Sequence, residues 1–265
     1  MKWNPEDYAK QSGAQLRWAQ ELISRLALGG SETILDVGCG DGKITAAFAS
    51  ASPNGYVLGV DSSAEFIAYA SEHYPPARFP SLHFQQMDAR SLNCGRQFDL
   101  IFSNAALHWV DNQMAFLQGA SAHLRPGGRL VTSCGGAGNA SGIIATLHEL
   151  QVSPRWRRYF DGFAFPYYFH SPAEYAPWLA QAGLVATRCE LVEKDMVHDH
   201  PEGLAGWIRT TWMPYTVRLP EELRESFIAE LLSLYLQNSP ADSSGRTHVH
   251  MVRLEVEATK ARAEA

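Results

Sequence analysis

The segment LDVGCGDGK, residues 35–43, carries glycines at alternate positions, Gly38, Gly40 and Gly42. This spacing lets the backbone turn tightly, and it lets a ligand touch main-chain atoms that a Cβ would shield. The pattern is not the phosphate-binding G-x-x-x-x-G-K-[ST], and it is G-x-G-x-G rather than the dinucleotide pattern G-x-G-x-x-G. The loop therefore predicts a bound ligand that is not anchored through a phosphate.

Three carboxylates stand where apolar segments end. Asp36, just before the glycines, disfavours a pyrophosphate and favours a cofactor that carries an ammonium and a sulfonium. Asp61 follows the next apolar segment, where an acid can reach ribose hydroxyls, and Asp88 in QQMDA can accept a hydrogen bond from an exocyclic amine. Together they predict S-adenosylmethionine. The alternative is that each acid only caps the following helix, which stays open chiefly for Asp88.

The elements that must hold these residues alternate between strand-like and helical patterns. Strands are predicted at residues 33–37, 56–61, 82–87, 99–104 and 129–134, with helices at 43–51 and 63–73 and a turn at 126–128. This order predicts a doubly wound α/β sheet of the Rossmann-like kind. Ligands of such sheets bind outside the carboxyl ends of the strands.

Beyond residue 135 the pattern changes. A helix is predicted near residues 140–151, and Ser171-Pro172-Ala173-Glu174 begins another that Gly183 ends. Further strands are predicted at 185–197 and 248–259, and a helix opens at residues 220–222. In the last strand Val252 and its apolar partners alternate with Arg253 and other charged residues, as in an antiparallel strand. Seven strands result.

These segments predict one domain. It comprises an N-terminal helical cap (1–30), a cofactor-binding core (31–135), two aromatic-rich cap insertions (136–183 and 198–246) and the final strands (184–197 and 247–259).

The motifs resemble those of the class I S-adenosylmethionine-dependent methyltransferases. DVGCGDGK resembles their first motif, GVDSSAEFI the second, QQMDA the third and FDLIFSNAALHW the motif of the fourth strand, while PGGRLV precedes the fifth. WNPEDY and NAALHW further resemble the subgroup of trans-aconitate and juvenile hormone acid methyltransferases. The resemblance is strong over residues 33–135 and implies an enzyme that uses S-adenosylmethionine and releases S-adenosylhomocysteine.

The resemblance also implies roles for matched residues. Gly38 and Gly40 would face the methionine part and Asp36 its amino group; Asp61 the ribose; Ser62 and Phe66 the adenine; Asp88 and Ala89 the adenine amine; Asn104 the transferable methyl; Cys39 and Ala105 complete this set. Tyr8 and Gln15 match an N-terminal helix that folds over the cofactor, with a plain helix surface as the alternative.

Methyl transfer from a sulfonium is a direct displacement, to which holding donor and acceptor in line contributes about 7–11 kcal/mol. A base helps a hydroxyl or amine acceptor, whereas a carboxylate needs none. His108 in NAALHW is the candidate catalytic base or acceptor-binding group. The alternative is a packed structural histidine beside Trp109.

Residues 156–169 read WRRYFDGFAFPYYF, with eight aromatic side chains among fourteen, against 11% in the whole chain. The predicted walls of a dry pocket for a small, partly apolar acceptor are Trp109, Tyr167, Tyr168, Trp207 and Trp212. The alternative is that such rings form the insertions' own core, and we expect this of at least half. Arg209 or an arginine of residues 155–158 is a candidate partner for an acceptor carboxylate.

Composition limits the partners. A net charge of −6 argues against nucleic acid, and no apolar run is long enough to cross a bilayer. The first residues lack a signal-peptide pattern, and four widely spaced cysteines indicate reduced thiols, so a cytoplasmic protein is expected. The paired histidines at 198, 200, 248 and 250 lack further ligands, so no metal is expected. Monomer and homodimer both stay open.

Two other functions fit the same sheet. One is a cofactor-binding regulatory or scaffold protein that kept the fold without turnover. The other is an enzyme that uses a nicotinamide or nucleotide-sugar cofactor, which the glycine spacing disfavours.

Overall fold

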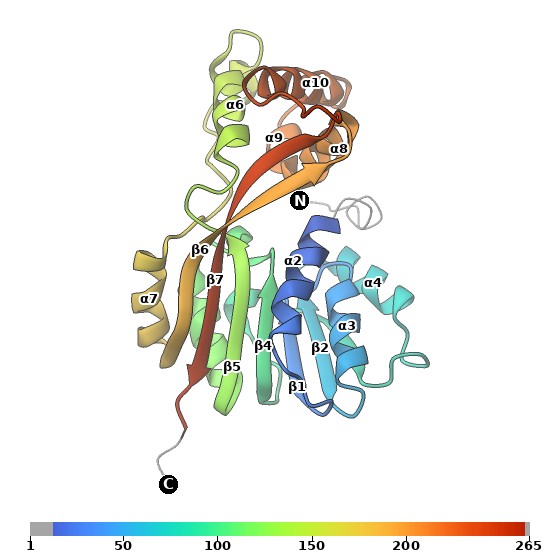
Figure 1. The fold of residues 1–265 in the computed structure, drawn as a ribbon, viewed down its shortest axis with the longest axis vertical. Helices are drawn as coiled ribbons and strands as arrows, with labels where there is room; N and C mark the ends of the chain where they lie inside the picture. Colours follow the sequence, from blue (N-terminus) through green and yellow to red (C-terminus); the bar gives the residue numbers. More distant parts are fainter. Residues whose placement is uncertain (1–12, 263–265) are drawn as a thin grey trace. The chain divides into compact units, whose positions relative to one another are not determined.

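A computed structural model describes residues 13–262, and its strands form one seven-stranded sheet in the order β3-β2-β1-β4-β5-β7-β6 (Figure 1). The strands are β1 (Thr33–Val37), β2 (Tyr56–Asp61), β3 (Leu82–Gln86), β4 (Phe98–Asn104), β5 (Leu124–Gly135), β6 (Leu184–His198) and β7 (Thr247–Lys260). Strands β1 to β5 pair in parallel, and β7 pairs antiparallel with β5. The predicted doubly wound sheet with an antiparallel last strand is confirmed.

Helices and short 3-10 turns connect the strands. They are α2 (Gly13–Ser24), α3 (Lys43–Ala51), α4 (Ala64–His73), η1 (Ala89–Ser91), η2 (Leu107–Trp109), α5 (Gln113–His123), α6 (Ser141–Val152), η3 (Arg157–Tyr159), α7 (Pro172–Gln181), α8 (Pro201–Thr211), α9 (Met213–Thr216) and α10 (Glu221–Asn238). The helix predicted at 43–51 is α3. The predicted cap of α7 is a complete capping box, in which Ser171 and Glu174 each accept the other's backbone N–H.

Both faces of the parallel strands are covered. On one face Leu22 of α2 and Phe48 of α3 pack against Phe102 of β4, and Figure 1 shows both helices in front of the strands. On the other face Phe116 of α5 and Leu179 of α7 join the second apolar cluster. Burial on two faces explains why all five residues of β1 are buried instead of every second one.

The chain packs into two compact units. Unit 1 contains Gly138–Pro166 and Glu193–Val252, hence α6, α8, α9, α10 and the adjoining ends of β6 and β7. Unit 2 contains the described residues up to Ala137, Tyr167–Val192 and the residues from Arg253 onward. The predicted cap insertion 136–183 is thus divided, because α7 packs on the sheet of unit 2 through Tyr175 and Leu179.

Two local expectations differ from the structure. The turn predicted at 126–128 is an irregularity inside β5, where pairing with β4 jumps from Leu124 to Arg129 and Gly127 has φ 78°. In β7 the charged positions do not face solvent, since Arg253 and Glu255 are 2% and 5% exposed. The physical reason is that α2 and the residue after it lie over this face, where Trp18 of α2 contacts Arg253 and Arg25, just after α2, contacts Glu255.

None of the helices between residues 13 and 262 has the length and apolar character that a bilayer crossing requires. Within the same residues no three His, Cys, Asp or Glu side chains are grouped to hold a metal ion. The four cysteines are free, with Cys39 and Cys134 buried.

Candidate functional site

The glycine loop follows β1 and is tied to β2. The N–H groups of Gly38 and Cys39 both donate to the carbonyl of Val60, at 2.7 and 3.0 Å. Gly38, Gly40 and Gly42 have φ of 75°, 52° and 82°, in the left-handed region that favours glycine. A Cβ on Gly38 would lie 2.1 Å from the Cβ of Ala106, so no other residue fits this position. The main chain of the loop at Gly38 therefore packs directly against Ala106, in the segment after β4.

Asp36, in β1, is a buried acid beneath this loop. It is 2% exposed, and its Oδ2 accepts a hydrogen bond from Thr45 Oγ1 of α3 at 2.8 Å. Burial raises its pKa to about 7; the Thr45 hydrogen bond opposes the shift, and the charges of Asp61 and Asp41 add to it. A bound cation would favour the ionised carboxylate.

Asp61, at the end of β2, faces the same loop. Its Oδ2 accepts from the N–H of Gly40 at 3.0 Å and its Oδ1 from that of Ser63 at 2.9 Å. Burial raises its pKa, although these backbone hydrogen bonds oppose the shift. Each carboxylate oxygen has a second lone pair, so Asp61 can accept hydroxyl donors as well.

Asp88 is engaged differently. Its Oδ1 accepts from the N–H of Arg90, which caps η1, and the guanidinium of Arg90 lies against both carboxylate oxygens at 2.6–3.2 Å. Arg90 also reaches Asp111 at 3.0 Å. The hydrogen bonds of Arg90 lower the pKa of Asp88. The capping alternative for Asp88 is thus seen in the structure, and its adenine contact stays a prediction.

The other residues predicted to contact the cofactor lie around these elements. Tyr8 lies outside the described residues; Gln15 belongs to α2; Ser62 is exposed and its carbonyl accepts from Gln86; Phe66 of α4 is 5% exposed; Cys39 is 6% exposed; Ala89 begins η1.

Asn104 ends β4 and Ala105 follows it. Asn104 is 6% exposed, and the N–H of Ala105 donates to the carbonyl of Ser133 in β5 at 2.8 Å. Ala105 has φ 56°, a left-handed conformation that is uncommon for a residue with a Cβ. Backbone strain of this kind often accompanies functional sites. Here the left-handed residue lies where the chain turns from β4 into η2.

The contacts of His108, in η2, determine which of its ring nitrogens carries the proton. The backbone N–H of Gly135 donates to His108 Nδ1 at 3.1 Å, and the residue is 8% exposed. Burial, with a smaller contribution from the charge of Arg253, lowers its pKa to about 3. The imidazole is therefore neutral near pH 7. Because Nδ1 accepts, the ring proton must be on Nε2. His108 thus offers a hydrogen-bond donor, and its base role is not supported.

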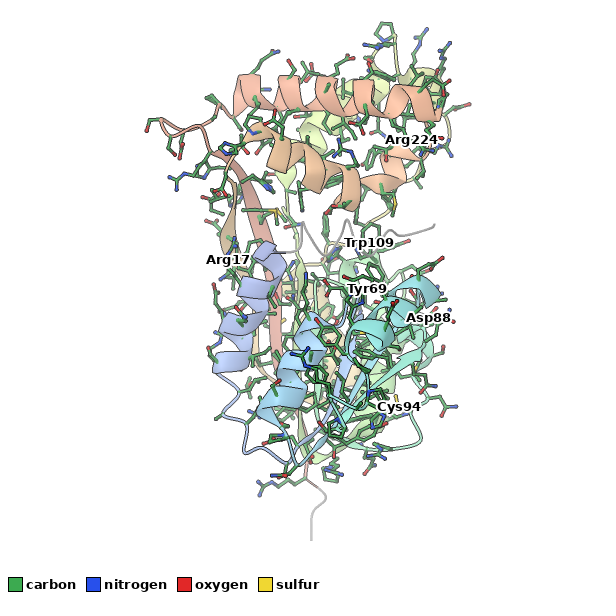
Figure 2. The ribbon with its side chains drawn as sticks, turned by 90° about the vertical axis from the view of Figure 1, so that its right-hand side faces the viewer. Arg17, Tyr69, Asp88, Cys94, Trp109 and Arg224 are labelled. Atoms are coloured by element: carbon green, nitrogen blue, oxygen red, sulfur yellow. The ribbon has the colours of Figure 1, made fainter. Side chains whose placement is uncertain are left out.

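Aromatic rings gather beside His108 within unit 2. The ring centroids of Trp109 and Tyr167 are 4.6 Å apart, and Tyr167 stacks on Phe169 at 5.6 Å. Tyr168 has an exposed side chain, while its backbone N–H donates to the carbonyl of His108 at 2.9 Å. Figure 2 shows Trp109 at the same end of unit 2 as Tyr69, with Cys94 toward the opposite end. This is the end where parallel strands place ligands.

A second group of aromatic side chains forms the core of unit 1. The ring of Phe227 contacts those of Trp156 and Phe160, at 5.2 and 5.6 Å. Trp207 and Trp212 lie 5.9 Å apart and are 1% and 2% exposed. This is the core arrangement that the sequence left open. That Trp207 and Trp212 also line an acceptor pocket stays a prediction.

The arginines proposed to pair with an acceptor carboxylate have partners inside unit 1. Arg209 binds both carboxylate oxygens of Glu225, at 2.8 and 2.6 Å, and Arg155 binds Glu230 at 2.8 Å. Both are therefore paired with carboxylates of α10, and the pairing of an arginine of residues 155–158 with an acceptor carboxylate stays a prediction.

A buried cation that sequence reasoning missed lies in unit 2. Arg253 of β7 donates from Nη2 to Asn104 Oδ1 at 3.2 Å and to the Ser133 carbonyl at 2.6 Å. Its Nε donates to Ser133 Oγ at 3.1 Å. The alternation in β7 placed Arg253 on a polar face. The only sequence signal was an arginine among apolar neighbours in the strand predicted to be last.

Comparison with known proteins agrees with this geometry. The family described as "Methyltransferase domain" matches residues 34–128. Trans-aconitate 2-methyltransferase of Deinococcus radiodurans is 31% identical over 223 residues, covering 83% of this chain and 84% of the relative. The chain is a class I S-adenosylmethionine-dependent methyltransferase.

Two further comparisons extend over most of the methyltransferase. Trans-aconitate 2-methyltransferase of Methylobacterium nodulans is 27% identical over 266 residues, covering 98% of this chain and 99% of the relative. The crystal structure of the YcgJ protein from Bacillus subtilis has a TM-score of 0.65 at 17% identity, covering 94% of this chain and 100% of that one. The second likeness concerns the fold.

The residues present fit the cofactor of this family. Gly38 and Gly42 keep the main chain of the loop close to its neighbours, since a Cβ there would lie 2.1 Å from Ala106 and 2.9 Å from Phe84. Asp36, which is buried, and Asp61, which is partly buried, supply two carboxylates next to the loop, which suits a ligand with a cationic end and hydroxyl groups. A phosphorylated nucleotide would meet these charges unfavourably.

Proposed function

We propose that this methyltransferase esterifies a carboxylate of a small polycarboxylic acid, and that His108 donates a hydrogen bond from Nε2 to that acceptor. The observation that carries the proposal is the hydrogen bond from Gly135 to His108 Nδ1, with the pKa of about 3. A neutral donor suits an acceptor that is already an anion. An amine or phenol would call for a base, and His108 is not available as one.

The relatives support the same acceptor class. Two proteins named trans-aconitate 2-methyltransferase align over most of this chain. Trp109 and Tyr167 supply an apolar surface beside His108, which fits the unsaturated carbon skeleton of such an acid.

S-Adenosylmethionine, when bound, supplies an electrophilic methyl group. Gly38 and Gly40 would hold its methionine part, Asp36 its amino group and Asp61 its ribose, with Phe66 and Asp88 near the adenine and Asn104 near the methyl. Tyr8 and Gln15 would cover it. These roles combine the family resemblance with the strand-end positions described above.

The setting of this reaction is part of the proposal. The proposed acceptor is a free small molecule, and the proposed location of the enzyme is the cytoplasm. A net charge of −6 disfavours a nucleic acid as the acceptor.

A pair of variants tests the role of His108. In His108→Gln the amide nitrogen stands near the position of Nε2 and keeps a donor there. In His108→Asn the amide reaches only the position of Nδ1. With trans-aconitate as acceptor, we expect the Asn variant to lose about 10–100-fold in kcat/KM and the Gln variant much less, as a hydrogen bond to a charged group contributes about 1.5–3 kcal/mol.

A panel of phenols and amines, assayed with labelled cofactor, serves as the control. Turnover confined to phenols or amines would reject the carboxylate acceptor. Equal loss in both His108 variants on the acid would reject the donor role.

A further inference from the structure

Gln113, at the start of α5, is a polar side chain buried inside unit 2. It is 1% exposed, and it is not needed to cap the helix, because the side chain of Asn112 already accepts the N–H of Ala115 at 3.0 Å. The amide of Gln113 contacts two other segments instead. Its Nε2 donates to the carbonyl of Leu107 in η2 at 2.8 Å and to the carbonyl of Tyr168 at 3.3 Å.

These two contacts determine how the amide of Gln113 is oriented. A carbonyl oxygen only accepts, so the atom that faces both carbonyls must be the NH2 group, which has one proton for each of them. The other amide atom, Oε1, is buried and accepts no hydrogen bond from the described residues. A leucine or a methionine would fill the same space without burying such an acceptor. The glutamine therefore serves this position through its two donors.

These donors attach the segment around Tyr168 to η2. The N–H of Tyr168 donates to the carbonyl of His108 at 2.9 Å, and Gln113 binds the carbonyl of Tyr168, so both backbone groups of this residue are held. Two residues later the carbonyl of His170 accepts the N–H of Ala137 at 3.0 Å. All these residues belong to unit 2. The segment is thus fixed at two neighbouring points, and Gln113 supplies part of the first.

The residues on both sides of Tyr168 contact His108. The ring centroids of Tyr167 and Phe169 lie 6.2 and 5.9 Å from that of the imidazole, whereas the side chain of Tyr168 is exposed. The ring of Tyr167 also lies 4.6 Å from that of Trp109. A shift of the Tyr168 backbone would therefore move two rings relative to His108.

We propose that Gln113 is a positioning residue, which attaches the Tyr168 backbone to η2 and so holds the rings of Tyr167 and Phe169 beside His108, where the acceptor binds. The inference rests on the proposed function for the place of the acceptor. A fixed apolar wall binds the acceptor equally in the ground state and the transition state, so loosening the wall raises KM more than it lowers kcat. The inference adds to the site a residue of α5 that no sequence motif indicated.

Two variants of Gln113 and one control test the attachment. Gln113→Met keeps a similar length and removes both donors. Gln113→Glu keeps the shape, replaces the NH2 group by an oxygen, and is the second variant if the first does not fold. The matched control is Asn112→Ala, which removes the cap of α5 one residue away and leaves the contacts of Tyr168 in place. Hydrogen exchange of single backbone N–H groups, followed by NMR, reports the attachment without any acceptor.

In Gln113→Met we expect the N–H of Tyr168 to exchange about tenfold or more faster than in the wild type. The N–H of Ala137 should stay within about 3-fold, because its contact with His170 does not involve Gln113. Asn112→Ala should leave the exchange at Tyr168 within about 3-fold of wild type. Unchanged protection of Tyr168 in both Gln113 variants overturns the proposal. An equal loss of protection in Asn112→Ala also overturns it, since the effect would then come from a weakened α5.

Kinetics with trans-aconitate connect the attachment to the reaction. Gln113→Met should raise KM about tenfold, with kcat and the affinity for S-adenosylhomocysteine within about 3-fold of wild type, and Asn112→Ala should behave like the wild type. An unchanged KM despite faster exchange at Tyr168 overturns the positioning role, and so does a cofactor affinity reduced as much as KM is raised. If the wild type methylates no carboxylic acid, the proposed function fails, while the exchange results still decide whether Gln113 attaches the segment.

Discussion

At the scale of single residues, two acids of the site lie in an environment that opposes their charge. Burial raises the pKa of both Asp36 and Asp61. The negative charge of Asp61 raises the pKa of Asp36 further. A cationic ligand would favour the ionised form of both acids. The arrangement should be visible as a pH dependence of both stability and binding.

Replacing Asp36 by Asn is expected to stabilise the empty protein above neutral pH. The folded chain holds the Asp36 proton more tightly than the unfolded chain, with a pKa of about 7 against 3.8. The free energy of unfolding of the wild type therefore falls as pH rises between about 4 and 7, and the variant lacks this decrease. Urea denaturation at intervals from pH 4 to 8 measures it. Affinity for S-adenosylmethionine should fall in the same variant.

Thr45→Val provides the companion measurement. It removes the hydrogen bond that opposes the shift, so the pKa of Asp36 should rise further and the stability decrease should extend to higher pH. Identical pH profiles for the wild type and Asp36→Asn would refute the buried-acid account.

Gly38 is expected to tolerate no side chain. Gly38→Ala places a Cβ 2.1 Å from that of Ala106 at a φ of 75°, so we expect a loss of more than about 2 kcal/mol in stability together with cofactor binding. Gly95→Ala isolates the conformational part, because Gly95 has φ 61° and nothing within 4 Å of the added Cβ. That control should lose about 1 kcal/mol. Calorimetry with S-adenosylhomocysteine and urea denaturation measure both; similar losses would show that the contact with Ala106 is unimportant.

At the scale of elements, local sequence patterns predicted the strands and α3 well. Their apolar runs, the glycines at their turns and their helix caps each depend on a few neighbouring residues in the sequence. The position of α2 over β7 was not predictable in this way, because alternation in β7 says which residues share a face and not whether a helix covers it. Arg253 and Glu255 were assigned to a polar face for that reason. His108 was found from its motif, but its tautomer depends on Gly135, a contact between distant segments.

The aromatic stretch 156–169 shows the same limit. Its composition indicated burial, yet the chain passes from unit 1 to unit 2 between Pro166 and Tyr167. Trp156 and Phe160 join α10, whereas Tyr167 joins His108 and Trp109. No periodicity marks that point, because both parts are rich in aromatic rings.

The capping box of α7 allows a test of an element. Ser171→Ala removes the acceptor for the Glu174 N–H and should lower the free energy of unfolding by about 1 kcal/mol. Ser171→Thr keeps an equivalent oxygen and serves as the control. Urea denaturation of both variants gives the difference, and no difference between Ala and Thr would mean that α7 is held by Tyr175 and Leu179 alone.

At the scale of the whole molecule, the described residues that would bind the cofactor belong to unit 2, and so does His108. Unit 1 has an aromatic core of its own. Each unit therefore has the apolar contacts needed for its own cooperative structure. A ligand that binds the glycine loop should stabilise unit 2 directly, since the residues around the loop come from β1, β2 and the end of β4.

Thermal unfolding with added ligands tests this assignment in the full chain. At a concentration of about 100 times Kd, S-adenosylhomocysteine should stabilise the native state by about 2.7 kcal/mol, which in a protein of this size raises Tm by several degrees. NADH at the same concentration should leave Tm unchanged, because its pyrophosphate would face Asp36 and Asp61. Asp61→Asn should reduce the shift with S-adenosylhomocysteine by weakening the contact with the ribose. A larger shift with NADH than with S-adenosylhomocysteine would contradict the charge argument on which the site is built.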